Sequence, residues 1–227
     1  MSQLHRHSIS SDDVRFFSGR SNPELALGIA QRLGLELAGT QYERFSNDNL
    51  EIQLGASVRG RVVFIVQSLV SPVAENLLEL LMMLDIARGA AAREVHAIVP
   101  YFSYARSDKK NQPRISIAAR LIADLLVTAG ATHVMTMTLH SPQVHGFFSI
   151  PIDPLTARAS FIRYLASMGP LDPAEVVVLS PDAGGAKSAS RVAADLGLSV
   201  AVATKTRISD TEVDIDPLIG KQVEGFR

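Results

Sequence analysis

Short runs of apolar residues alternate along the chain with longer stretches in which apolar positions follow a helical spacing. Several of the short runs, such as VVFIV (62–66), show no polar alternation, which is typical of strands buried on both faces of a parallel sheet. The runs predict strands at 14–18, 62–67, 94–100, 133–139, 175–180 and 199–204. The longer stretches predict helices at about 23–34, 73–89, 115–129, 157–167 and 186–196. This order of elements predicts an α/β fold.

The pattern is interrupted near PIDPLTA (151–157) by two prolines and a turn-prone Asp153. We therefore expect an N-terminal α/β domain over residues 1–152 and a second α/β domain over 153–227. Ligands of open parallel sheets bind beyond the carboxyl ends of the strands, so the residues after each strand are the candidates for function. These residues are 67–68, 101–110, 140–146, 180–187 and 205–207.

The composition limits the classes of protein that remain. With 227 residues, 47% of them hydrophobic, the chain is long enough for one or two globular domains. A formal net charge of −1 argues against a nucleic-acid-binding protein, which usually carries a basic excess. The sequence shows neither an apolar run of membrane-spanning length nor a secretory signal, so we expect no membrane partner. The absence of cysteine excludes disulfides and thiol catalysis, and we expect a cytoplasmic protein.

The stretch SPDAGGAK (180–187) follows one predicted strand and leads into a predicted helix. Gly184 and Gly185 permit a positive φ and a close approach of the backbone to a ligand, and N–H groups at a helix start form an anion cradle. Asp182 would repel a bare phosphate, but it fits if a cation lies between them or if it accepts a hydrogen bond from a sugar hydroxyl. An ordinary turn with Asp182 as an N-cap is the alternative. The spacing does not match a Walker A loop.

A basic stretch follows another predicted strand, at residues 100–114. It carries Arg106, Lys109, Lys110 and Arg114 together with aromatic side chains. Such a cluster beyond a buried strand suits a polyanion such as a nucleoside triphosphate. A solvated basic loop is the alternative.

Two further strand ends carry candidate residues. His140 directly follows a predicted strand, where it could ligate a metal or donate to a phosphate; a hydrogen-bonded, partly buried histidine is the alternative. Lys205 and Arg207 alternate along a strand and would point to the same side, which suits a transition state that gains charge. Their alternative role is to protect an edge strand from pairing. His133 is interpreted as structural. Together, the strand ends predict a site for a metal-bound polyphosphate.

From about residue 14 onward the sequence resembles the ribose-phosphate pyrophosphokinases, or phosphoribosyl diphosphate synthetases. The resemblance implies two phosphoribosyltransferase-like domains with mainly parallel sheets flanked by helices. It also implies an enzyme that transfers the diphosphoryl group of MgATP to the C1 hydroxyl of ribose 5-phosphate, with Mg²⁺ as cofactor. The enzyme would be a homohexamer assembled from dimers. The matching stretches are SNPELA (21–26), RFSN (44–47), SVRG (57–60), ELLMMLD (79–85), YARSDKK (104–110), TAGATHV (128–134), LHSPQVHGFFSIPID (139–153) and SPDAGGAK (180–187).

The same resemblance implies roles for individual residues at the matching positions. It places ATP against five residues, the adenine contacts coming from a neighbouring subunit. These are Phe45, Asn47 and Ser107 at the adenine, Arg106 at the phosphates, and His140. The remaining roles are Mg²⁺ binding by His140 and Asp182, a diphosphate loop of Asp182, Ala183, Gly184 and Gly185, and stabilisation of the transferring group by Lys205 and Arg207. A regulatory site for phosphate or ADP would be lined by Ser57, Arg59, Lys110 and Arg114.

The sequence departs from the family pattern at four places. Asn49 stands where the family usually has glutamate, Ser107 where it has glutamine, and Thr138 where it has aspartate. From these changes we expect a looser nucleotide preference or weaker Mg²⁺ binding. The ribose-phosphate loop of the family does not occur and would follow Arg227, so we expect the second domain to be incomplete. The chain is then either a fragment or a short homologue, and the alternative function is a catalytically weak nucleotide-binding homologue that regulates active subunits.

Overall fold

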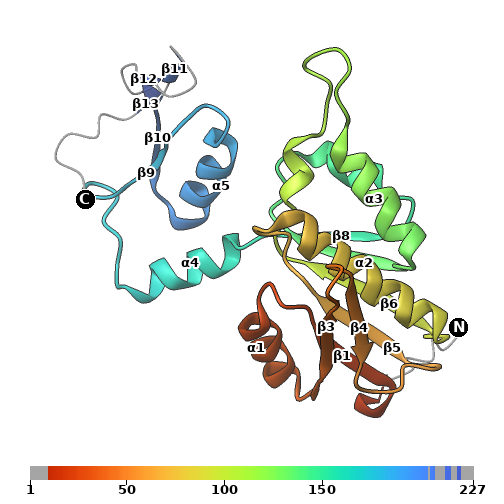
Figure 1. Ribbon diagram of the computed structural model, residues 1–227. Coiled ribbons are helices and arrows are strands. Elements are labelled where there is room, and N and C mark those ends of the chain that lie inside the picture. Colours follow the sequence, from red (N-terminus) through yellow and green to blue (C-terminus); the bar gives the residue numbers. More distant parts are fainter. Residues whose placement is uncertain (1–9, 204, 208–212, 216–218, 221–227) are drawn as a thin grey trace, which may run out of the picture. The chain divides into compact units, whose positions relative to one another are not determined.

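The computed structural model describes residues 10–203, 205–207, 213–215 and 219–220 (Figure 1). The chain splits into two compact units, Met1–Leu155 and Thr156–Arg227. The domain limits expected from the sequence, 1–152 and 153–227, stay a prediction. In the described part of the chain, no helix combines the length and the apolar character that crossing a membrane requires.

The first unit is built on a parallel sheet of six strands in the order β2-β1-β5-β6-β7-β8. The predicted α/β fold with a parallel sheet is therefore confirmed. β5 is buried along most of its length, which explains its unbroken apolar run. The strands are β1 (Val14–Ser18), β2 (Leu37–Ala38), β5 (Val62–Val66), β6 (Glu94–Val99), β7 (His133–Met137) and β8 (Ile152–Leu155).

Three helices cover this sheet, α1 (Pro23–Leu33), α2 (Val73–Gly89) and α3 (Ala118–Ala129). Neighbouring residues of β1 point to opposite faces: Phe17 belongs to the large core with α2 and α3, and Phe16 to a smaller core with α1. Figure 1 shows α2 and α3 together on one face. Short 3₁₀ turns precede β1 and follow β6 and β7, at Ser11–Asp13, Ser103–Arg106 and Pro142–Phe147.

The limits of α1 follow from its terminal residues, as the sequence predicts. The Asn22 side chain accepts a hydrogen bond from the Leu25 N–H at 3.2 Å, and Pro23 occupies the first helical position. Gly34 ends the helix with φ of 66°, a left-handed conformation that glycine adopts readily. The predicted helix at 73–89 coincides with α2, which ends at Gly89.

An antiparallel hairpin, β3 (Thr40–Arg44) and β4 (Leu50–Leu54), was not predicted. Only alternate residues of its strands are apolar, and Tyr42, Leu50 and Ile52 pack against the large core. The turn is closed by backbone bonds from the Phe45 N–H to the Asn49 oxygen and from the Asp48 N–H to the Phe45 oxygen, both 2.9 Å.

Part of the stretch 151–157, where the sequence analysis expected an interruption, is the edge strand β8, so the expected turn at Asp153 was wrong. The division between the two units, after Leu155, does fall within this stretch. Ile152 is buried, and Asp153 lies within the strand, paired with Met135 of β7. The Thr138 N–H donates to the Leu155 oxygen at 2.7 Å. Prolines are tolerated here because an edge strand does not use every backbone N–H for pairing.

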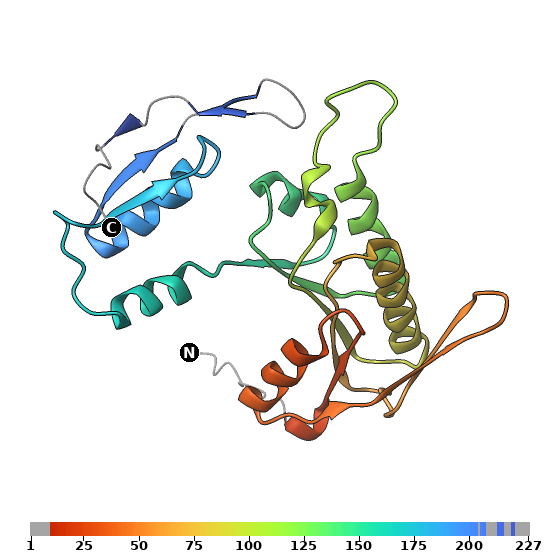
Figure 2. The same ribbon diagram turned by 60° about the vertical axis from the view of Figure 1, so that its left-hand side comes forward.

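The second unit contains α4 (Arg158–Ser167), β9 (Val177–Ser180), α5 (Ala186–Leu196) and β10 (Ser199–Val202) (Figure 2). β9 and β10 are parallel neighbours joined through α5, and β13 (Ile219–Gly220) pairs antiparallel to β10. β11 (Lys205–Arg207) and β12 (Val213–Ile215) form a separate antiparallel pair. The strand that ends before SPDAGGAK is not buried on both faces, because Leu179 of β9 is 51% exposed.

Candidate functional site

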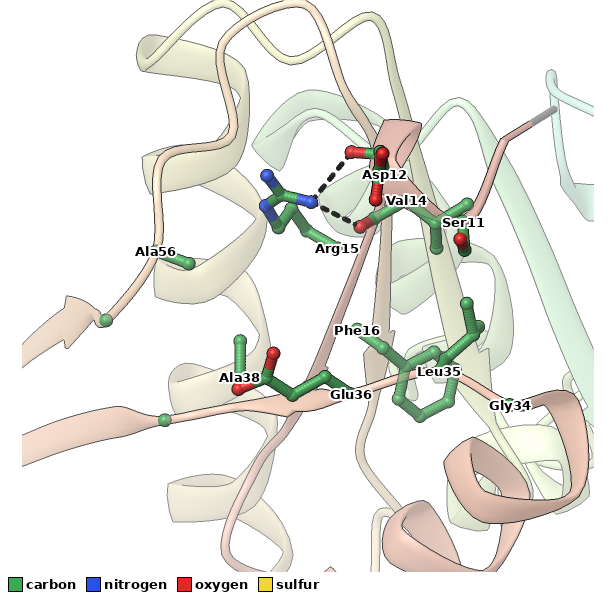
Figure 3. A pocket seen from close by; sticks show the side chains of 12 residues that line it. Ser11, Asp12, Val14, Arg15, Phe16, Gly34, Leu35, Glu36, Ala38 and Ala56 are labelled. Atoms are coloured by element: carbon green, nitrogen blue, oxygen red, sulfur yellow. Dashed lines mark hydrogen bonds between the residues drawn. The ribbon is translucent and has the colours of Figure 1, made fainter.

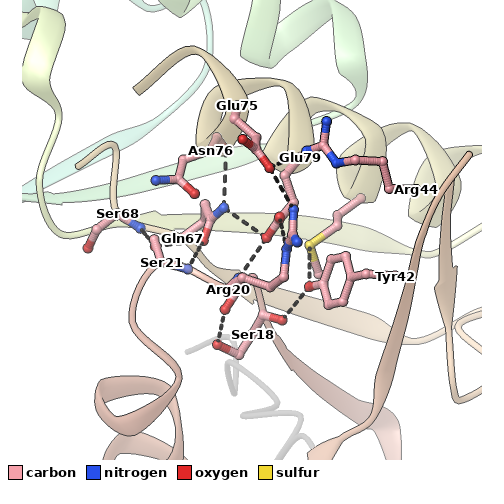
Figure 4. Close-up of polar contacts among 12 residues, drawn as sticks. Ser18, Arg20, Ser21, Tyr42, Arg44, Gln67, Ser68, Glu75, Asn76 and Glu79 are labelled. Carbon is pink, nitrogen blue, oxygen red and sulfur yellow. Dashed lines mark hydrogen bonds and ion pairs between the residues drawn. The ribbon is translucent and has the colours of Figure 1, made fainter. Parts of the chain in front are cut away.

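The carboxyl ends of β1 and β5 are filled by a buried hydrogen-bond network (Figure 4). The Gln67 side chain, fully buried, accepts hydrogen bonds from the Ser21 N–H (3.1 Å) and hydroxyl (2.6 Å). Its amide donates to the Glu79 carboxylate (3.0 Å) and to the Asn76 backbone oxygen (3.2 Å). The Ser68 N–H donates to the Ser21 hydroxyl at 2.8 Å. Residues 67–68, candidate ligand contacts in the sequence, are therefore bound within the protein.

Glu79 is the charged centre of this network and has no exposed surface. Its carboxylate accepts a hydrogen bond from the Arg20 N–H at 2.6 Å and forms an ion pair with the Arg20 guanidinium at 2.8 Å. The bond to Glu79 raises the pKa of Arg20. Arg20 also lies over the ring of Tyr42, 4.9 Å from its centre, and burial raises the pKa of Tyr42. The carboxyl ends of β1 and β5 are thus occupied by the protein's own hydrogen bonds and ion pairs.

The carboxyl ends of β6 and β7 instead border a small cavity of about 130 Å³. Arg106, from the turn after β6, and His140, three residues beyond the end of β7, both line it. Tyr101 and Thr138 also line this cavity. Two of the predicted phosphate and metal contacts therefore share one pocket at the predicted edge of the sheet.

Thr138 adopts φ of 52°, in the left-handed region. A β-branched residue is strained there, whereas aspartate, which the resemblance leads one to expect at this position, is tolerated better. Backbone strain of this kind is concentrated at binding and catalytic sites. The conformation of Thr138 thus distinguishes this strand end from those of β1 and β5.

The hairpin residues lie beside a second, more apolar cavity of about 600 Å³ between β4, α2 and α3. Phe45 and Asn49 are among its lining residues. The Asn47 side chain accepts a hydrogen bond from the Asn49 N–H at 3.2 Å, which orders the turn locally. Phe45 remains 43% exposed, so its ring is available for a contact outside its own turn.

A third cavity, of about 520 Å³, lies at the opposite edge of the sheet, near the start of β1 and β2 (Figure 3). Arg15 lines it and donates to the backbone oxygens of Asp12 (2.9 Å) and Val14 (2.8 Å). The lining residues include none of those predicted for function. The amino-terminal edge is also not where parallel sheets bind their ligands.

In the second unit, the loop after β9 is tightly folded around Asp182. Its carboxylate accepts a hydrogen bond from the Gly185 N–H at 2.9 Å, and the buried Ser180 hydroxyl donates to the Asp182 backbone oxygen at 2.7 Å. A Cβ on Gly185 would lie 2.7 Å from that hydroxyl, and one on Gly184 would lie 3.2 Å from the carboxylate. Neither glycine has a positive φ, so the expected positive φ was wrong. At Gly185 lack of space explains the glycine, whereas a close approach of this backbone to a ligand stays a prediction.

Comparison with known proteins settles the family. Residues 14–130 match the profile of the N-terminal domain of ribose phosphate pyrophosphokinase. The chain belongs to the ribose-phosphate pyrophosphokinase family. It is 52% identical over 208 residues to a putative ribose-phosphate pyrophosphokinase of Streptomyces coelicolor, covering 92% of this chain and 65% of that protein. It is 50% identical over 204 residues to the ribose-phosphate pyrophosphokinase of Deinococcus radiodurans, covering 90% and 63%.

A solved structure agrees with this assignment. The fold matches the crystal structure of phosphoribosylpyrophosphate synthetase from Mycobacterium smegmatis with a TM-score of 0.81 and 34% identity. The match covers 90% of this chain and 67% of that one. The chain thus spans just under two thirds of the length of the Streptomyces and Deinococcus relatives, at 65% and 63%.

For a member of the pyrophosphokinase family, the predicted site residues are distributed over both units. Arg106 and His140 belong to the first unit, and residues 182–185 belong to the second. Their convergence on one rim stays a prediction. Lys205 and Arg207 occupy alternate positions of β11, and their side chains lie outside the described residues.

Ser107 has a local structural role. Its hydroxyl donates to the Ser116 oxygen (3.2 Å) and accepts from the Ala118 N–H (3.1 Å) at the start of α3. The Ser107 backbone oxygen accepts a further bond from the Ala119 N–H at 3.1 Å. The hydroxyl thus fastens the basic loop to the helix that follows it. A contact of Ser107 with adenine stays a prediction.

The four residues expected at a regulatory site are not brought together within one chain. Ser57 and Arg59 precede β5 and so lie toward the amino-terminal edge of the sheet. Lys110 and Arg114 follow β6 and lie beyond the carboxyl edge. A site that uses all four would need residues from two copies of the chain.

Proposed function

We propose that the chain takes part in the reaction for which its relatives are named. In this reaction the diphosphoryl group of MgATP passes to the C1 hydroxyl of ribose 5-phosphate, giving phosphoribosyl diphosphate and AMP. The observation that carries the proposal is the shared pocket of Arg106 and His140 at the carboxyl ends of β6 and β7. It lies at the sheet edge where the fold class binds ligands.

The pocket suits a phosphate tail rather than a whole nucleotide. Its volume of about 130 Å³ is below the few hundred Å³ of typical small-molecule sites. Arg106 is exposed and presents a planar guanidinium, which matches phosphate oxygens in a bidentate geometry. We infer that Arg106 holds phosphate oxygens of ATP while Phe45 and Asn47, at the tip of the hairpin, contact adenine.

The residues present fit a Mg²⁺ ion that arrives with the nucleotide. Among the described residues, no group of three acidic, histidine or cysteine side chains could hold a metal alone. Mg²⁺ in phosphoryl-transfer sites keeps waters and binds through one or two protein groups plus substrate phosphates, so no such group is required. We infer that His140 and Asp182 hold it, with Asp182 oriented by the Gly185 N–H. Bound there, the ion would neutralise charge on the transferring phosphates.

The loop after β9 is proposed to bind diphosphate through the backbone of residues 182–185. Gly185 fits against the Ser180 hydroxyl with no room for a side chain, and its N–H donates to the Asp182 carboxylate, so the loop is held in a compact turn whose backbone can approach an anion. Lys205 and Arg207 are proposed to stabilise charge on the transferring group. A regulatory site for phosphate or ADP, shared between copies in a homo-oligomer, completes the proposal.

The test is release of AMP that depends on both ATP and ribose 5-phosphate. We expect Arg106→Ala to lower kcat/KM by roughly 10²–10³-fold, because a phosphate-binding donor is lost. Arg32→Ala, which removes an arginine from the last turn of α1, is the matched control and should leave turnover unchanged. AMP release that ignores ribose 5-phosphate would contradict the proposal. ATP binding without AMP release would favour a regulatory homologue.

A further inference from the structure

Ion pairs among Arg44, Glu75 and Arg20 connect the end of the β3–β4 hairpin to α2 and to the loop after β1 (Figure 4). Arg44, the last residue of β3, donates to a carboxylate oxygen of Glu75 on α2 at 2.5 Å. The same oxygen accepts a hydrogen bond from Arg20 at 3.1 Å. Glu75 therefore joins the hairpin to the loop that follows β1.

The inner end of this set of ion pairs is fixed. Arg20 forms its ion pair with Glu79, which is fully buried, and a buried carboxylate holds its partner firmly because leaving it unpaired is costly. The outer end reaches the turn itself. Arg44 also pairs with Asp48 at 2.6 Å, and Asp48 adopts φ of 70°. A continuous set of ion pairs thus runs from the buried edge of the sheet to the turn at 45–49.

The turn is not part of the hydrophobic core. Tyr42, Leu50 and Ile52 pack the body of the hairpin against the large core, whereas Phe45 is 43% exposed. The Arg44 and Glu75 side chains are themselves about two-fifths exposed, so their pair contributes little to the overall stability of folding. The pair does, however, link the end of β3 directly to α2.

We propose that Glu75 is a positioning residue for the nucleotide, because it holds Arg44 against Arg20 and so fixes the turn that carries Phe45 and Asn47. The inference rests on the proposed function, in which this turn contacts adenine. Two variants distinguish a change in the position of the turn from the loss of one negative charge. Glu75→Gln removes the carboxylate that joins Arg44 to Arg20. Glu43→Gln removes one from the neighbouring position of β3, where Glu43 faces Glu51 across the hairpin.

The first measurement is hydrogen–deuterium exchange of the full chain, which does not depend on any ligand. The amides of Phe45 and Asp48 are bonded within the turn, so their exchange reports its order. We expect Glu75→Gln to speed exchange of these amides several-fold and to leave the amides of α3 unchanged. Glu43→Gln should have no such effect. Turn exchange in Glu75→Gln equal to that of the unaltered chain would overturn the inference.

The second measurement is the affinity of the full chain for MgATP by calorimetry. Loss of a negative charge alone would tighten binding of an anion, whereas a displaced turn weakens it. We expect Glu75→Gln to weaken binding roughly three- to ten-fold and Glu43→Gln to leave it unchanged or slightly tighter. Arg44→Gln combined with Glu75→Gln should be no worse than the weaker-binding single variant, because the pair acts as a unit.

The two measurements distinguish failure of the proposed function from failure of the positioning role. If the unaltered chain does not bind MgATP, the proposed function is wrong, and the exchange data still decide whether Glu75 orders the turn. If MgATP binds and Glu75→Gln binds as tightly as the unaltered chain, the positioning role is refuted while the proposed function stands.

Discussion

At the scale of single residues, Gly19 shows how closely the network after β1 is packed. A Cβ at this position would lie 2.3 Å from the Gln67 side-chain oxygen, 2.5 Å from its amide carbon and 2.8 Å from the Glu79 carboxylate. These atoms belong to a fully hydrogen-bonded, buried group and have little freedom to move. Glycine is therefore required here for space.

We expect Gly19→Ala to lower the free energy of unfolding by about 2–3 kcal/mol, because the buried side chains must shift from their partners. Gly28→Ala is the matched control. Gly28 lies inside α1 with nothing within 4 Å of the added Cβ, so alanine should stabilise the protein by about 0.5–1 kcal/mol. Urea unfolding measures both. A Gly19→Ala protein as stable as the unaltered one would show that the side chains of the network can move without loss of stability.

His96 and His133 form a second cluster that depends on single atoms. Their Nδ1 atoms face each other at 3.0 Å across β6 and β7, and their Nε2 atoms lie 3.1 Å from carboxylate oxygens of Glu94 and Asp153. His96 also stacks on Phe64. Only one of the two facing nitrogens can carry a proton without a clash. His133 is thus structural, as the sequence analysis interpreted it.

Burial lowers the pKa of His96 below 6.5, against the opposing hydrogen bond with Glu94, and the charge of a protonated His133 lowers it further. The unfolded chain then binds more protons between the folded pKa and about 6.5, so stability falls as the pH drops through this range. We expect the urea midpoint to decrease from about pH 7.5 to about pH 5.5, and less so in His96→Gln. An NMR titration that gives His96 a pKa above 6.5 would contradict this.

At the scale of elements, helices were predicted best because their ends carry local signals. α1 has Asn22, Pro23 and Gly34 at its limits, and the apolar spacing of 73–89 matches α2 residue for residue. The hairpin β3–β4 was missed because few of its residues are apolar and these alternate with polar or charged ones. Neither strand is recognisable alone, because each is defined by its pairing with the other. β8 was missed because prolines usually end strands, except at a sheet edge.

The site could be predicted only in part, for a related reason. The order of strands predicts which residues follow each strand, and so it predicts the pairing of Arg106 with His140 in one pocket. It does not reveal which strand ends are occupied by the protein itself. Gln67 is satisfied by Ser21 and Glu79, whose approach depends on how the loop after β1 and helix α2 pack together. Such partners become visible only in three dimensions.

At the scale of the whole molecule, the apolar core is unevenly shared between the two units. Every residue of both hydrophobic clusters lies in the first unit, between Phe16 and Ile152. The buried apolar residues described in the second unit are Ala193, Ala201 and Ala203. Since hydrophobic burial is the main favourable term in folding, the first unit holds most of the stabilising apolar surface among the residues whose burial the structure describes.

We therefore expect residues 1–155 expressed alone to fold and to unfold in urea at nearly the same midpoint as the corresponding transition of the full chain. Circular dichroism and the exchange protection of β5 amides are suitable readouts, with the full chain as the control. A fragment that is unfolded, or whose midpoint falls by more than about 1 M urea, would show that the first unit depends on the second.

The sealed ends of β1 and β5 beside the open ends of β6 and β7 have a consequence for redesign. We expect the loops that border Arg106 and His140 to tolerate sequence changes, since the described hydrogen bonds to the buried carboxylate of Glu79 come from Arg20 and Gln67. The loops after β1 and β5 hold the buried network in place, so we expect changes there to destabilise the fold before they alter specificity. Novel chemistry on this scaffold should therefore arise on one side of the sheet edge alone.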